Sequence, residues 1–282
     1  MWNQIKTVLL LGVLAGMMLA VGGLFWGRTG LTIALVLALG MNLITYFFSD
    51  KIVLAIYRAK EARKSEYPAL HRMIEELSRE ADIPKPRIYI IPTETPNAFA
   101  TGRNPKHAVV AATEGILKLL SEKELRGVMA HELGHVKNRD ILITTIAATI
   151  AAVISYAAMM ARYAAIFGGS NDRNNNGGQL IGLIVLTILA PLVALIVQLA
   201  ISRAREYQAD VTGAHLCKDP HSLAHALEKI HDGVKKHPMR FGHPATSSLF
   251  IANPFTADFF VTLLSTHPPM AERVRRLKEM RV

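Results

Sequence analysis

The stretch His131-Glu132-Leu133-Gly134-His135 decides how the rest of this sequence is interpreted. On a helix, residues four positions apart lie on one face, one turn above the other. Two imidazoles placed in this way can bind one zinc ion, and Glu132 then lies beside the metal. Zinc lowers the pKa of a bound water to about 7, and a neighbouring carboxylate can accept the proton. The stretch therefore predicts a zinc site with hydrolytic chemistry.

The residues before this stretch predict the helix that carries it. Ser121 followed by Glu124 is a capping box, so we expect the helix to begin near Glu122. Apolar residues give this helix one buried side: Leu125, Val128, Met129 and Leu133. The alternative is a structural helix whose two histidines donate hydrogen bonds to backbone carbonyls.

The composition favours a membrane protein without disulfides. The chain has 282 residues, a net charge of +10 and a mean hydropathy of +0.26. A chain that is both basic and apolar on average favours a membrane over nucleic acid as its partner, and we expect no nucleic acid. The single cysteine, Cys217, excludes an intrachain disulfide and a zinc site built from several cysteines.

Four uncharged apolar runs predict membrane-spanning helices. They cover residues 7–26, 31–49, 141–161 and 180–201, and each is close to the roughly 20 residues that cross a bilayer. The alternatives are a cleaved signal peptide for the first run and a pair of buried soluble helices for the last two. A cluster of Lys and Arg at residues 51–64 follows the second run. The positive-inside rule therefore places this cluster and the N-terminus in the cytoplasm.

These runs divide the chain into four parts. We expect a transmembrane hairpin over 1–50, a cytosolic catalytic part over 51–140, a second hairpin over 141–201 and a second catalytic part over 202–282. The first catalytic part also predicts a helix over 67–81 and short strands at 87–91, 97–101 and 108–112. The expected fold is mainly α with a small β-sheet, in a multi-pass membrane protein with a zincin-like catalytic domain built around the helix of His131.

The strand that begins at Asn97 is the candidate for binding substrate. In zinc peptidases of this general design, an extended substrate backbone pairs with an edge strand of the sheet. The predicted substrate-binding edge therefore consists of Asn97, Ala98, Phe99 and Ala100. An ordinary core hairpin is the alternative.

The stretch 202–210 supplies a candidate for the third zinc ligand. A catalytic zinc site has three protein ligands and leaves the fourth position to water. Glu206 suits the ligand role, and Asp210, one turn later, suits a bond that orients a ligand imidazole. The alternative is a surface pairing of these acids with Arg203 and Arg205.

Distances along the chain favour the ligand role of Glu206. His135 lies six residues before the third apolar run, about 9 Å along a helix, and Glu206 lies five residues after the fourth, about 7.5 Å. If the two runs are antiparallel neighbours, both side chains lie at a similar height above one membrane face. His221 and His225 are a rival pair with the same spacing. No acid lies between them, so we expect them to be surface histidines.

With these features the chain resembles the HtpX family of membrane-bound zinc metalloproteases, relatives of the CAAX prenyl protease. The resemblance covers nearly the whole chain and rests on four motifs: NAFATGRNP from Asn97, HELGHVKNRD from His131, SRAREYQAD from Ser202 and STHPPMAERVRRL from Ser265. It implies one catalytic Zn²⁺ held by His131, His135 and Glu206. It also implies that Glu132 is the general base, that Asp210 supports a ligand, and that His267 and Arg273 stabilise the oxyanion.

The resemblance implies an endopeptidase that cuts misfolded or damaged membrane proteins in protein quality control. It would lie in the bacterial cytoplasmic (inner) membrane with its active site facing the cytoplasm. Its partners would be the lipid bilayer and membrane-protein or unfolded-polypeptide substrates. Two alternatives stay open: a prenyl-protein processing protease, which shares the zinc motifs, and a non-enzymatic membrane scaffold with a closed metal site. Residues 241–260 carry no functional prediction.

Overall fold

The computed structural model describes residues 50–140, 176–241, 249–255 and 267–282, together with positions 36, 40, 47, 48, 142–144, 146, 147, 150, 151, 154 and 158. For residues 176–188 it describes the backbone alone. The chain divides into two compact units. The first comprises Met1–Thr45 and Ile143–Ile201, and the second comprises Tyr46–Leu142 and Ser202–Val282.

The predicted membrane spans fall mostly outside the described residues. This holds for nearly all of 7–26 and 31–49 and for most of 141–161. The fourth run, 180–201, lies within the helix α6 (Asn176–Cys217), which contributes residues to both units. Among the described residues, no helix combines the length and the apolar character that crossing a membrane requires.

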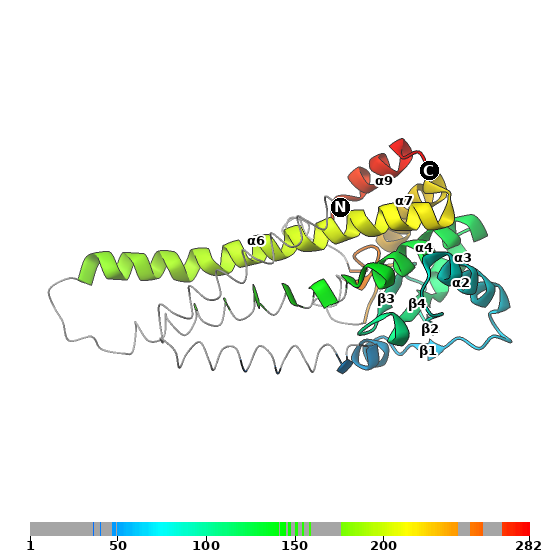
Figure 1. The fold of residues 1–282 in the computed structure, drawn as a ribbon, viewed down its shortest axis with the longest axis horizontal. Coiled ribbons are helices and arrows are strands. Elements are labelled where there is room, and N and C mark those ends of the chain that lie inside the picture. Colours follow the sequence, from blue (N-terminus) through cyan, green and yellow to red (C-terminus); the bar gives the residue numbers. More distant parts are fainter. Residues whose placement is uncertain are drawn as a thin grey trace. The chain divides into compact units, whose positions relative to one another are not determined.

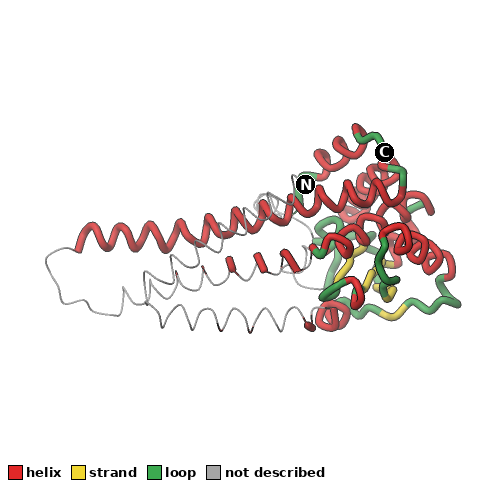
Figure 2. Tube along the Cα trace, in the orientation of Figure 1, coloured by secondary structure: helices red, strands yellow, loops and turns green. Residues whose placement is uncertain are grey.

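The second unit is mainly helical and contains a small four-stranded sheet (Figures 1 and 2). The strands lie in the order β1 (Lys60–Glu61), β2 (Arg87–Ile91), β4 (Val109–Thr113) and β3 (Ala98–Thr101). β2 and β4 are parallel, and the other two pairs are antiparallel. The mainly α fold with a small sheet is confirmed, and the strand after Asn97 lies at the edge of the sheet. β1 and the helix α3 (Glu114–Leu119) were not predicted.

Successive side chains of a strand face opposite sides, and both faces of this sheet are buried. On one face, Ala98, Ala100 and Val110 share a core with three helices: α2 (Pro68–Ala81), α4 (Glu122–Asn138) and α7 (Pro220–Lys236). On the other face, Phe99 packs with Tyr57 and Phe250. The edge strand is therefore held from both sides.

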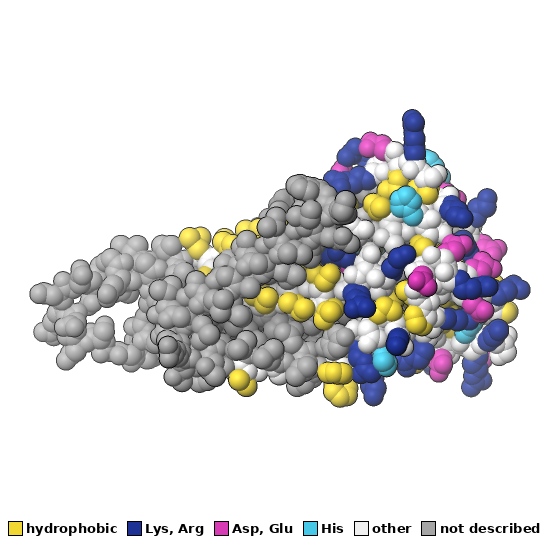
Figure 3. All heavy atoms as spheres, in the orientation of Figure 1, with side chains coloured by type: hydrophobic (Ala, Val, Ile, Leu, Met, Phe, Trp, Pro, Cys, Tyr) yellow, Lys and Arg dark blue, Asp and Glu magenta, His cyan; other side chains and the backbone are white. Residues whose placement is uncertain are grey.

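Local sequence signals set the ends of the helices. α2 begins at Pro68, one residue after the predicted start at 67. The side chain of Asp219 accepts a hydrogen bond from the backbone N–H of Ser222 and caps α7. Pro269 precedes the last helix, α9 (Met270–Glu279), which packs against α7 (Figure 1). Lys and Arg side chains on the face drawn in Figure 3 are spread among acidic ones, so this face is mixed in sign where it is described.

Candidate active site

The helix α4 presents the histidines of the motif on one side. It begins at Glu122, and Ser121 and Glu124 form the capping box that the sequence predicts. His131 and Glu132 are buried, with 0% and 1% of their surface exposed. The Nε2 atoms of His131 and His135 lie 3.1 Å apart. Both imidazoles therefore point one nitrogen at the same small space.

The helix α6 brings Glu206 to that space. Its Oε1 lies 3.4 Å from Nε2 of His135, and its Oε2 lies 3.9 Å from Nε2 of His131. Ligands bound tetrahedrally to zinc at about 2.0–2.2 Å lie about 3.3–3.6 Å apart. The three side chains therefore fit a metal ion, and within the described parts of the chain no other trio of His, Cys, Asp or Glu meets in this way.

Two glycines allow α4 and α6 to cross closely. A Cβ at Gly213 would lie 2.8 Å from the Cα and the backbone nitrogen of His131. A Cβ at Gly134 would lie 3.2 Å from the carbonyl oxygen of Ala209. Because neither glycine has a side chain, the backbones of α4 and α6 can approach closely enough for Glu206 to reach the two histidines.

A carboxylate backs each of the two histidines. Nδ1 of His131 lies 3.0 Å from Oδ1 of Asp210, and Nδ1 of His135 lies 2.8 Å from Oδ2 of Asp140. Such bonds hold the hydrogen on Nδ1, so the lone pair of Nε2 faces the ligand space. Asp210 occupies the position that the sequence analysis expects.

Asp140 was missed by the sequence analysis. It follows Arg139, the C-cap of α4, whose φ of 55° is left-handed. This turn brings the acid back beside the helix. The sequence does place an acid directly after the end of the helix, close enough to reach back to His135. The left-handed turn that brings it there could not be predicted, because glycine or asparagine, not arginine, is typical of that conformation.

Two buried arginines neutralise these acids. Arg273, with 0% of its surface exposed, donates from Nε and Nη2 to the two oxygens of Asp210, at 2.8 and 2.7 Å. Arg205 pairs with Asp140. Burial works against the charge of Asp210, but Arg273 outweighs it and lowers the pKa of that carboxyl to about 2. Asp210 therefore stays ionised behind His131.

Glu206 lies between cationic groups. Its Oε2 is 3.2 Å from Nδ1 of His267 and 3.1 Å from Nη1 of Arg273. Burial opposes its ionisation, but His267 and Arg273 outweigh this effect and lower the pKa of Glu206 well below its usual range. Burial also opposes the charge of His135, yet Asp140 and Glu206 raise the pKa of this histidine to about 9. The ligand space therefore favours positive charge.

Glu132 differs from the other acids of the site. Neither of its carboxylate oxygens has a hydrogen-bond partner among the described residues. Burial raises its pKa to about 7, and the charge of Glu206 adds to this, while His135 and the backbone amide of Ala100 oppose it. Such a group can exchange a proton near neutral pH.

The strand β3, the predicted substrate-binding edge, packs against α4, but its residues make different contacts. The Asn97 side chain is buried and donates to the carbonyl of Ala252, at 2.7 Å. Ala100 has its amide beside Glu132. The rival pair, His221 and His225, is exposed on α7, as expected of surface histidines.

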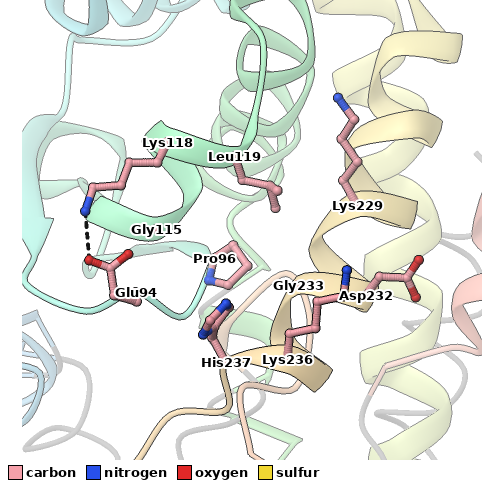
Figure 4. A pocket seen from close by; sticks show the side chains of 10 residues that line it. All are labelled: Glu94, Pro96, Gly115, Lys118, Leu119, Lys229, Asp232, Gly233, Lys236 and His237. Carbon is pink, nitrogen blue, oxygen red and sulfur yellow. Dashed lines mark hydrogen bonds and ion pairs between the residues drawn. The ribbon is translucent and has the colours of Figure 1, made fainter.

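A separate hollow of about 430 Å³ lies away from the metal ligands, between α3, α7 and the loop before β3 (Figure 4). Two of the lysines on its wall are paired with acids: Lys118 with Glu94 at 2.7 Å, and Lys229 with Glu124 at 2.8 Å. None of the predicted site residues lines it.

Comparison with known proteins identifies the family of the chain. The model of peptidase family M48 matches residues 64–281. The chain belongs to this family. Three relatives, each named "Protease HtpX homolog", are similar to almost all of it. The one from Persephonella marina is 56% identical and covers 99% of this chain and 97% of its own. Those from Sulfurihydrogenibium sp. and Pyrococcus furiosus are 52% and 50% identical, over 99% and 98% of this chain and 97% and 95% of theirs.

This M48 peptidase is a metal-dependent protease. The family and the names of the relatives confirm the hydrolase that the sequence analysis expects, so the non-enzymatic scaffold is excluded. Among solved structures, S. mikatae Ste24p matches with a TM-score of 0.60 at 20% identity, over 98% of this chain. At that identity the likeness concerns the fold, and this chain spans 65% of the length of Ste24p.

Proposed function

We propose that the chain is a membrane-anchored zinc endopeptidase that cuts misfolded or damaged membrane proteins at the cytoplasmic face of a bacterial inner membrane. One observation carries the catalytic part: His131, His135 and Glu206 converge within 4.8 Å of one another, with each imidazole backed by an acid. The uncharged runs 7–26 and 31–49, followed by the cations of 51–64, support the membrane anchor and its orientation.

His131, His135 and Glu206 would hold the metal. A zinc ion, when bound, supplies a water of lowered pKa and polarises the substrate carbonyl. Asp210 and Asp140 keep both imidazoles in the orientation and tautomer that binding requires. A ligand set of two imidazoles and one carboxylate suits zinc in a catalytic rather than a closed structural site.

Glu132 is the proposed general base. Its buried carboxylate forms no side-chain hydrogen bond among the described residues, and its pKa of about 7 suits proton transfer at neutral pH. It accepts a proton from the attacking water and returns it to the leaving amine. The strand β3, at the edge of the sheet, is the proposed partner of the extended substrate backbone.

His267 and Arg273 have different proposed parts. His267 stabilises the developing oxyanion as a hydrogen-bond donor beside Glu206, from which its Nδ1 is 3.2 Å away. Arg273 was expected to share this role, but its donors are engaged with Asp210, Glu206 and the carbonyl of Ile251. We propose that it supports the site by positioning these partners.

Zinc content and casein cleavage together test the proposal. The variant Glu132→Gln, loaded with zinc after purification under chelation, should hold one zinc per chain and lose at least about 100-fold in cleavage rate. Glu122→Gln, at an exposed position in the first turn of the same helix, is the matched control and should keep both properties. Cleavage by Glu132→Gln at the rate of the unaltered protein would refute the mechanism.

Side-specific cysteine labelling tests the membrane topology separately. In a Cys217→Ser background, Asn175→Cys should react with an impermeant reagent only from the outside of the cell. Labelling from the cytoplasmic side would contradict the four-span arrangement without touching the metalloprotease assignment.

A further inference from the structure

The helix before β1 carries large apolar side chains on its outer face. Residues 50–56 are helical, as are the described positions 47 and 48 (blue in Figure 1). Phe48, Ile52 and Ile56 follow one another at intervals of four, so they lie along one side of this helix. Their exposed fractions are 49%, 47% and 37%, and that of Phe47 is 44%. We call these four residues the apolar patch.

The opposite face of this helix already has its core. Val53 and Tyr57 have 6% and 0% of their surface exposed and belong to the cluster that contains Phe99 and Phe250. The rings of Tyr57 and Phe250 pack edge-on, with their centroids 4.9 Å apart. This packing fixes which side of the helix faces the second compact unit. The core of that unit therefore does not use the apolar patch, and an exposed patch of large apolar residues is typical of an interaction surface.

Cations lie over both aromatic rings of the patch. Nζ of Lys51 is 5.8 Å from the centroid of the Phe48 ring, and Cζ of Arg103 is 5.2 Å from that of the Phe47 ring. No acid among the described residues pairs with either cation. The surroundings of the patch are therefore positive, which complements a partner that is apolar and negatively charged.

The acid of the helix does not oppose such a partner. Asp50 is the first charged residue after the uncharged run 31–49, and its carboxylate lies 2.9 Å from Nη2 of Arg87. A free carboxylate here would be repelled by anionic lipid. Because Arg87 balances its charge, the helix can pass from the apolar run to Ile56 without presenting an unpaired negative charge.

The length of the patch determines how this helix can meet a membrane. Eight residues of helix, from Phe48 to Ile56, rise about 12 Å. The headgroup layer on each side of a bilayer is only about 5–8 Å thick. A helix that continued straight out of the bilayer would leave Ile56 in water. An inclined helix instead keeps both ends of the patch at the membrane surface, as in helices that lie in the interface.

We propose that the apolar patch, with Lys51 and Arg103 beside it, is a contact of the second unit with the membrane surface and fits a bilayer that contains anionic phospholipids. The apolar side chains lie at the boundary between headgroups and acyl chains, and the two cations lie at the level of the headgroup phosphates. This inference rests on the proposed membrane anchor. It extends the membrane contact from the end of the apolar run 31–49 to Ile56 and into the unit that carries the metal site.

The contact bears on the position of the metal site. Arg103, whose guanidinium lies over Phe47, lines a small hollow together with the proposed ligand His135. One arginine side chain therefore connects the apolar patch to the surroundings of the site. Contact of the patch with the bilayer holds the site close to the headgroup layer. The peptide bonds within its reach are then those of a membrane protein just outside the hydrocarbon region.

Fluorescent labels on the patch test the contact in the full-length protein. In a Cys217→Ser background, Ile52→Cys or Ile56→Cys is labelled with bimane, and the protein is reconstituted in vesicles of phosphatidylcholine and phosphatidylglycerol. Lipids brominated in the upper part of their acyl chains should quench both labels by about half or more, since an interfacial helix buries its apolar face about 5–10 Å deep. Iodide in the water should quench them only weakly.

Lys123→Cys is the matched control. Lys123 is exposed in the first turn of α4, and Asn138, at the end of the helix near Arg103, lies 15 positions or about 22 Å further along. A label at Lys123 should be quenched by iodide and not by brominated lipid. Zinc content equal to that of the unaltered protein shows that each variant has folded.

The outcomes separate the contact from the anchor on which it rests. Iodide quenching at Ile56→Cys as strong as at Lys123→Cys, in a chain that still resists carbonate extraction, would overturn the contact alone. Protection from both quenchers would show that protein covers the patch, and would also overturn it. Release of the chain by carbonate would instead refute the proposed membrane anchor.

Lipid charge tests the part played by the cations. Lys51→Gln should lower the ratio of lipid-contacting to water-exposed label at Ile56→Cys about fivefold, as for the loss of one cation near an anionic surface. Lys51→Arg should keep this ratio, and Lys123→Gln should leave it unchanged. Vesicles of phosphatidylcholine alone should lower it at least as much as Lys51→Gln. Equal ratios in the two kinds of vesicle would refute the fit to anionic lipid.

Discussion

Replacing Gly213 by alanine is expected to weaken metal binding through the backbone of α4. A Cβ at this position would lie 2.8 Å from the Cα and the nitrogen of His131, whereas ordinary contacts of a Cβ begin near 3.4 Å. Both of these atoms belong to a helix backbone and cannot rotate away. The two helices must therefore separate locally by about 0.6 Å, the difference between the two distances.

This separation of the two helices also moves Glu206, on α6, away from His131. Oε2 of Glu206 is 3.9 Å from Nε2 of His131, and bonds of about 2.0–2.2 Å to one ion cannot join atoms more than about 4.2 Å apart. A shift of about 0.6 Å carries the pair beyond this limit unless Glu206 changes its rotamer. Loss of ligand geometry of this kind lowers metal affinity about 10- to 100-fold, or about 1.4–2.7 kcal/mol.

Gly127→Ala is the matched control. A Cβ there would lie 3.0 Å from the Cα of Leu223, where α4 packs against α7 rather than α6. Each substitution gains about 1 kcal/mol in helix propensity and loses about 1–3 kcal/mol through overpacking, so thermal unfolding should change comparably in both. Competition with a chromophoric chelator measures zinc affinity. Equal affinities in the two variants would refute the argument that Gly213 sets the metal geometry.

Other substitutions test the supports of the site. Asp140→Asn keeps an acceptor for the imidazole but removes the charge opposite Arg205; we expect zinc affinity to fall about tenfold in the same titration, and an unchanged affinity would contradict the orienting role. Ser121→Ala should lower the free energy of unfolding of the protein by about 0.5–2 kcal/mol through the lost cap, with zinc affinity unchanged. Arg273→Lys keeps the charge but loses the two-bond contact with Asp210, so stability and zinc affinity should both fall. A loss in kcat alone would instead favour a direct role of Arg273 at the oxyanion.

The two histidines on α4 that we propose as ligands could be predicted because all the necessary information is local. The spacing of His131 and His135 matches one helical turn, and the capping box at Ser121 fixes where that helix begins. Glu206 is less local, since it lies 71 positions after His135 in the sequence. Its prediction required the assumption that the third and fourth apolar runs are antiparallel neighbours. The residue types of Glu206 and Asp210 alone do not show that these acids lie near the histidines.

The remaining contacts are long-range and leave no pattern in the sequence. Asn97 reaches Ala252 across 155 positions, and no periodicity links the two. The sequence predicted that residues 97–100 bind substrate as one stretch. It could not show that the side chain of Asn97 is already hydrogen-bonded to Ala252 within the protein. Tertiary pairing decides which backbone groups of a strand already have hydrogen-bond partners. Strand propensity depends on residue type and carries no information about this pairing.

The buried charges show why so many acids can surround one metal site. Each ligand histidine is backed by an acid and each acid by an arginine, in two parallel chains: His131, Asp210, Arg273 and His135, Asp140, Arg205. Each acid–arginine pair adds no net charge, so the remaining carboxylates of the ligand space are Glu132 and Glu206, and Arg273 also lies 3.1 Å from the latter. A divalent cation would offset their charge, whereas loss of either arginine would leave a further buried negative charge unpaired. The arginines therefore let carboxylates orient both imidazoles without adding charge to the site, which leaves one carboxylate for the metal and one for the proton.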